Sequence, residues 1–216
     1  MNKDMSKKMR RASDLSHEAK WGRLTPEEIA YVEQKLQDKK ADEDEDLPTW
    51  IFIVGRLALI RHRPLLEKFL YHQMEPWVCI QALRALCTYW EYTQDYLKEL
   101  KMFIRGVEWD PHDDIRLWAL SIAGDFLKEH YDPELLQLLL DVFEKLGKLD
   151  SLQEQREYAR EFIQSCAFKA LAIASGKKYD EILDTDDIEN CLLNGQMELL
   201  DLSVLKKARQ RLQQKF

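Results

Sequence analysis

Few side chains in this sequence have the type and spacing that chemistry requires. The histidines His62, His72 and His112 are scattered along the chain. His72 with Cys79 would need two further ligands to hold a zinc ion, and solvation at a helix end is the simpler use of that histidine. The motifs of serine hydrolases, zinc peptidases and phosphate-binding loops do not occur. We therefore expect no metal, no cofactor and no enzymatic activity.

One pair of residues remains a candidate for catalysis. Trp109 and Asp113 lie four residues apart, in a polar corner that precedes an apolar segment. In a second interpretation Asp113 or Asp114 caps the following helix and Trp109 packs against the corner. Both interpretations are open on the sequence alone.

The elements that must position these residues are predicted helices whose buried side carries small residues. In the segment 76–93, Val78, Ala82 and Ala85 share one side at helical period. Three further segments repeat this spacing, beginning at Ile51, Ile115 and Ile163. Small residues at the centre of an apolar side allow a neighbouring helix to approach closely. The recurrence favours stacked helical hairpins, and an ordinary all-α bundle is the alternative.

The composition and the positions of the prolines and glycines agree with an all-α fold. The chain has only seven glycines and six prolines, and every proline precedes an apolar periodic segment, as suits the first turn of a helix. Thr25, Asp110 and Asp132 stand just before prolines and are predicted N-caps. Most glycines follow such segments, where a left-handed helix end favours them.

The segment 110–120, DPHDDIRLWAL, resembles the second helix of a HEAT-like repeat, including the arginine after the isoleucine. The resemblance covers about residues 48–175. It implies an all-α superhelix, a HEAT-like solenoid of about four hairpins with helical N- and C-terminal extensions. We expect basic N-terminal helices and an acidic linker in 1–46, the repeat core in 47–176 and C-terminal capping helices in 177–216. The start of the chain, 1–21, is either a frayed helix or a disordered tail, and the segment 149–157 is a predicted insertion.

The chain also resembles, in outline, the HEAT-like alkylpurine DNA glycosylases. In that family the concave face of a small solenoid holds tryptophans that contact a damaged nucleotide and a carboxylate that stabilises developing positive charge. Only Trp109 and Asp113 can be carried over to those roles. The resemblance implies an alternative function, an enzyme that acts on alkylated bases.

Charge favours a protein partner over nucleic acid. Residues 1–40 hold 10 basic and 7 acidic side chains, a balance of +3, and residues 41–216 hold 22 and 32, a balance of −10. An acidic body is a poor match for a phosphate backbone and a good match for a basic protein. We expect a non-enzymatic scaffold that binds a protein through the concave face, and its narrower form is an immunity or antitoxin protein that neutralises a basic partner. We further expect a monomer or weak dimer. A cytoplasmic location is expected because the cysteines have no CxxC spacing, as suits free thiols in a reducing compartment, and because no segment is long enough to span a membrane.

Five side chains are the predicted partner-binding residues on the concave face. They occupy outward positions of the second helices and are Trp77, Arg84, Trp118, Asp125 and Lys169. Tryptophan and arginine are enriched where binding energy concentrates. In the alternative, Trp77 and Trp118 bridge adjacent hairpins in the core.

Overall fold

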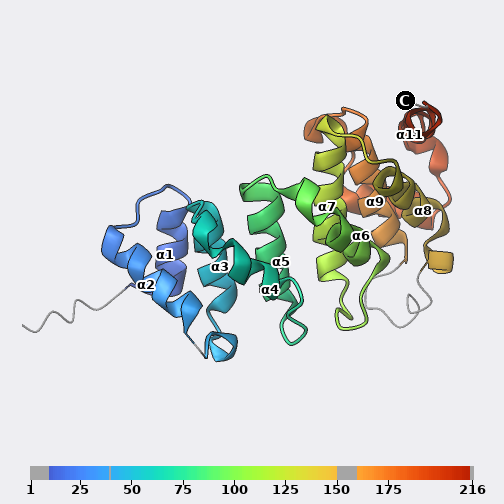
Figure 1. Cartoon of the computed structure of the whole chain (residues 1–216). Helices are drawn as coiled ribbons and strands as arrows, with labels where there is room; N and C mark the ends of the chain where they lie inside the picture. The colour runs from blue at the N-terminus through green and yellow to red at the C-terminus, as the bar shows by residue number, and fades with distance from the viewer. Residues whose placement is uncertain (1–9, 39, 150–159, 215–216) are drawn as a thin grey trace, which may run out of the picture. The chain divides into compact units, whose positions relative to one another are not determined.

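The computed structural model describes residues 10–38, 40–149 and 160–214, without the side chains of 147–149. All regular structure in these ranges is helical, which confirms the all-α prediction (Figure 1). The chain forms two compact units, Met1–Tyr92 and Thr93–Phe216, and each is described separately below.

Unit 1 is built around one apolar helix, α3. Its α-helices are α1 (Ala12–Ala19), α2 (Pro26–Gln37), α3 (Leu47–Arg56), α4 (Arg63–Phe69) and α5 (Pro76–Arg84). Helix α3 packs against α1, α2 and α5, and a π-helical turn, Ala85–Tyr89, continues α5. At Gly55 an added Cβ would lie 2.8 Å from the Cβ of Ala85, so only glycine permits this approach of α3 to the π-helical turn.

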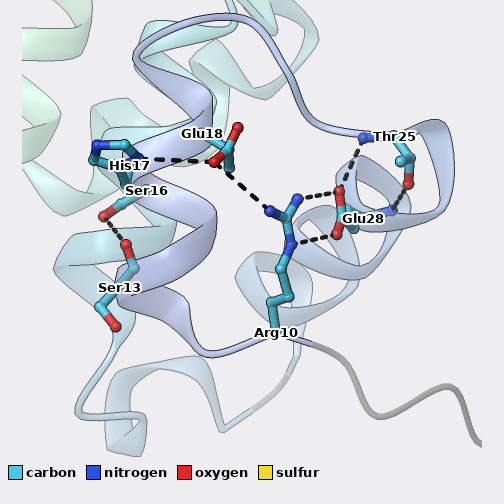
Figure 2. Close-up of polar contacts among 7 residues, drawn as sticks. All are labelled: Arg10, Ser13, Ser16, His17, Glu18, Thr25 and Glu28. Carbon is cyan, nitrogen blue, oxygen red and sulfur yellow. Dashed lines mark hydrogen bonds and ion pairs between the residues drawn. The ribbon is translucent and has the colours of Figure 1, made fainter.

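The start of α2 is tied to the segment before α1. The Nε and Nη2 atoms of Arg10 each donate to one oxygen of the Glu28 carboxylate at 2.8 Å, and Figure 2 shows these two contacts. Thr25 and Glu28 also form the capping box of α2, which confirms the predicted cap. These contacts fix α1, whose C-terminal end forms part of a groove described below.

Unit 2 is built around two adjacent helices, α7 and α9. Its α-helices are α6 (Leu97–Arg105), α7 (Asp114–Glu129), α8 (Pro133–Leu149), α9 (Arg160–Ala174), α10 (Thr185–Leu193) and α11 (Ser203–Gln213). Helix α7 packs along α9, where a Cβ at Gly124 would lie 2.8 Å from the Cα of Ala170. Helix α8 covers α9, and α6 covers α7 and α8.

The small residues of the repeated pattern face neighbouring helices, as predicted. Ala82, Ala119 and Ala167 are all fully buried. Close helix packing in each unit therefore depends on the side chains that the sequence pattern selects. The arrangement of the hairpins into a solenoid remains a prediction.

The predicted helix starts hold with one exception. Five prolines lie in the first turn of α2, α3, α4, α5 and α8. The prediction was wrong at Pro111, because α7 begins only at Asp114. Asp113 adopts a left-handed conformation with φ of 57°, so the chain cannot continue from Pro111 as one helix.

Three further sequence predictions concern the insertion, the acidic run and the first two helices. The predicted insertion at 149–157 falls, apart from Leu149, outside the described residues. The acidic run 42–46 is not purely a solvated linker, because Asp44 accepts hydrogen bonds from Lys35 and from the Trp50 indole. Helices α1 and α2, expected outside the repeat core, pack against α3.

Candidate binding surfaces

A groove in unit 1 brings three cationic side chains together. It has a volume of about 640 Å³ and is lined by residues of α1, α3 and α5 and their ends, namely Ser16, Lys20, Trp21, Pro48, Thr49, Phe52, Arg56, Gln81, Arg84 and Tyr89. We call it the basic groove, since Lys20, Arg56 and Arg84 are its only charged lining residues. It includes one of the predicted partner-binding residues, Arg84.

Aromatic rings hold the cations of the basic groove. The guanidinium carbons of Arg56 and Arg84 lie 5.2 Å and 5.6 Å from the centroid of the Tyr89 ring. Arg84 also donates to the Tyr89 hydroxyl at 2.8 Å. The Lys20 ammonium lies 5.9 Å from the Phe52 ring, which meets Tyr89 edge to face. Cations over aromatic faces are attracted by the ring quadrupole, so these side chains are oriented before any ligand arrives.

The π-helical turn at the end of α5 is part of the groove. It carries Tyr89, and the amide of Trp90 donates to Ala85 five residues earlier. Such turns insert one extra residue per helical turn and are frequent at functional sites. Here the turn carries the ring that supports both arginines.

A second surface, in unit 2, gathers carboxylates around α7, α9 and α10. Its centre is a pocket of about 260 Å³ lined by Leu117, Ser121, Cys166, Lys169, Ala170, Ile173, Tyr179 and Thr185. The carboxylates Asp125, Glu161, Asp184, Asp186 and Glu189 stand near these residues. We call this surface the acidic face.

The electrostatics of the acidic face indicate an excess of negative charge. Burial, with Asp186 and Glu161 nearby, raises the pKa of Glu189. Burial and the neighbouring Asp125 carboxylate, which accepts from the Tyr179 hydroxyl at 2.8 Å, raise the pKa of Tyr179 to about 12. Burial also raises the pKa of the Cys166 thiol to about 11, which disfavours a nucleophilic thiolate at neutral pH.

The structure brings two of the five predicted partner-binding residues to the acidic face. Lys169 lines its pocket, 3.9 Å from Asp184, and Asp125 binds Tyr179. Trp77 is 46% exposed on α5 and does not line the basic groove, and Trp118 is half-buried on α7.

The candidate catalytic pair occupies structural positions. Asp113 is fully buried, with its Oδ1 3.2 Å from Nη1 of Arg116. Trp109 packs edge to face on Phe103. Asp113 makes no side-chain capping hydrogen bond at the start of α7, where the Asp110 carboxylate instead accepts from the Ile115 amide at 2.9 Å. Burial of the Asp113 carboxylate favours the structural interpretation of this corner.

Most residues of both surfaces could not be predicted from the sequence. Lys20, Phe52, Arg56 and Tyr89 come from three different helices, and only the packing of α1 and α5 on α3 brings them together. Tyr179 lies 54 residues from its partner Asp125. The sequence carried one local signal for the basic groove. Arg56 lies four residues after Phe52, and Arg84 lies five residues before Tyr89.

Within the described ranges no cluster of histidine, cysteine, aspartate or glutamate side chains has the geometry of a metal site. In the same ranges every helix is too short or too polar to cross a membrane. Comparisons with protein-family models, with curated proteins and with solved structures found no match for this chain.

Proposed function

We propose that this protein is a non-enzymatic scaffold that binds a protein partner through its acidic face. In this proposal the helical hairpins form a HEAT-like solenoid, and the outer sides of α7 and α9 belong to its concave surface. Support comes from the small residues that let helices pack closely, such as Gly124 against Ala170. Closely stacked helix pairs are the unit from which solenoids build extended binding surfaces.

We propose the acidic face as the binding surface because carboxylates crowd around Glu189. Its pKa is raised by burial and by Asp186 and Glu161, so its charged form is disfavoured in the isolated protein. A cationic side chain placed there would stabilise the charge and lower that pKa. The surface therefore favours a partner rich in lysine and arginine.

The distribution of charge along the chain supports the same partner. Residues 1–92 hold 15 basic and 15 acidic side chains, whereas residues 93–216 hold 17 and 24, so the formal charge of −7 belongs to unit 2. Complementary charge speeds association and selects partners. Neutralisation of a basic toxic protein, as in an immunity or antitoxin role, is the narrower form of this proposal.

Affinity capture from the native cell tests the proposal. The wild-type protein should recover a basic protein whose yield falls sharply with the variant Asp186→Asn/Glu189→Gln. The matched control, Glu129→Gln/Glu198→Gln, removes two carboxylates elsewhere in unit 2 and leaves the acidic face intact. Equal recovery by both double variants would contradict a role of the acidic face in binding.

A further inference from the structure

The basic groove of unit 1 combines cationic side chains with a lining that contains no carboxylate. Lys20 and Arg56 form no ion pair with any residue in the described ranges. Arg56 instead donates to the Lys20 carbonyl at 3.3 Å. Two positive charges are thus held on one groove without an acidic partner of their own, in a unit whose net charge is zero.

The remaining lining residues add donors and one open apolar surface. Ser16, Thr49 and Gln81 carry polar side chains at the groove wall. Trp21, which is 63% exposed, and Pro48 provide apolar contact area. The volume of about 640 Å³ is larger than a single small anion needs and lies in the usual range of ligand pockets.

Two observations disfavour a nucleic acid as the occupant. Single-stranded nucleic acid is bound by aromatic faces on which bases stack. Here the Phe52 and Tyr89 rings already support Lys20, Arg56 and Arg84, which leaves Trp21 as the one open aromatic ring of the lining for successive bases to share. Unit 1 itself holds 15 basic and 15 acidic side chains, so it lacks the excess of positive charge that a long phosphate backbone favours.

We infer that the basic groove binds an acidic peptide segment of a protein, with its carboxylates on Lys20, Arg56 and Arg84 and an apolar side chain against Trp21. This site goes beyond the proposed function, because it lies in the other unit and selects the opposite charge. Arginine forks match carboxylates in two-point hydrogen bonds, and the aromatic support fixes the forks beforehand.

The test is fluorescence anisotropy with the full chain and a short labelled peptide of glutamate and leucine. The affinity should fall about twofold to fivefold in Lys20→Ala and in Arg56→Ala, as expected for loss of one exposed ion pair. The control variant Lys68→Ala, an exposed cation of α4 outside the groove, should bind like the wild type. Thermal unfolding followed by circular dichroism verifies that each variant is folded.

Three comparison probes make the result decisive. The same peptide with glutamine in place of glutamate should bind at least about tenfold more weakly, a loss of roughly 1.4 kcal/mol. Equal binding of both peptides, no binding of the glutamate peptide, or equal weakening by Lys68→Ala would overturn the inference. Tighter binding of oligothymidylate or of inorganic phosphate would also overturn it, by assigning the groove to nucleic acid or to small anions. Because the peptide is synthetic, none of these results depends on the acidic face.

Discussion

The Asp113 carboxylate lies 3.2 Å from the Arg116 guanidinium, and neither side chain is more than 1% exposed. Arg116 also donates to the carbonyls of Ile104 and Arg105, the last two residues of α6. One arginine thus closes the C-terminal end of α6 and neutralises a carboxylate at the start of α7. The corner that the sequence offered as a catalytic candidate joins two helices.

Substitution of the buried arginine should be strongly destabilising. Arg116→Met leaves the Asp113 charge without its neighbour, and breaking such a pair from one side costs about 3–5 kcal/mol. The double variant Arg116→Met/Asp113→Asn should recover part of this loss, since asparagine is neutral and tolerates the left-handed conformation. Urea unfolding measures both. A double variant as unstable as the single one would exclude the unpaired charge as the cause.

Helix α7 should not tolerate a side chain at its closest approach to α9. In Gly124→Ala the new Cβ would stand 2.8 Å from backbone atoms of Ala170, so one helix must shift. We expect a loss of about 1–3 kcal/mol in the free energy of unfolding, as for other overpacked cores. Glu129→Ala, at the exposed end of the same helix, should change it by no more than about 0.5 kcal/mol. Comparable losses in the two variants would contradict the close approach.

The sequence pattern was sufficient for the helices and for their buried sides. Prolines located most helix starts, and the alanines Ala82, Ala119 and Ala167 marked sides that are fully buried. The pattern failed at Pro111, because Asp113 forms a left-handed turn between this proline and α7, with its side chain buried against Arg116. Helical periodicity does not show where such a turn interrupts the chain.

The two surfaces were less predictable for a related reason. Asp125, Lys169 and Arg84 were recognised as outward positions of helices. The side chains that complete their surroundings, such as Tyr179 and Arg56, approach them only through tertiary packing. Helical periodicity defines the side of a helix but not which other helix faces it.

The ion pair between Arg10 and Glu28 should make the free energy of unfolding decrease at low pH. The Arg10 guanidinium and the Thr25 amide lower the pKa of Glu28 below its ordinary 4.5. The folded protein therefore releases this proton more readily than the unfolded chain. The resulting stabilisation is complete above pH 4.5 and disappears as the pH falls through the lowered pKa.

The variant Glu28→Gln tests this dependence. It should be less stable than the wild type at pH 7, and the difference should shrink as the pH falls below 4.5. Thr25→Ala, which removes the other half of the capping box, should cost about 1 kcal/mol. Chemical denaturation over a pH series measures both, and a difference for Glu28→Gln that stays constant with pH would refute the assignment.

For Glu189, the dependence of stability on pH should have the opposite sign. Its pKa is raised in the folded protein by burial and by its acidic neighbours, so the folded state holds this proton more tightly than the unfolded chain. Stability from this group is lost as the pH rises from 4.5 through the raised pKa. Glu189→Gln should therefore raise the melting temperature at pH 7 and leave it unchanged well below pH 4.5. An equal rise at both pH values would show that charge is not involved.

The salt dependence of partner binding tests the central claim most directly. Once the captured partner is purified, titration calorimetry at low and at physiological ionic strength gives its dissociation constant under both conditions. If the acidic face binds a basic protein, the affinity should fall by about tenfold or more as salt screens the opposing charges. A dissociation constant that does not change with salt would mean that apolar contacts hold the complex, and the proposed role of the acidic face would be wrong.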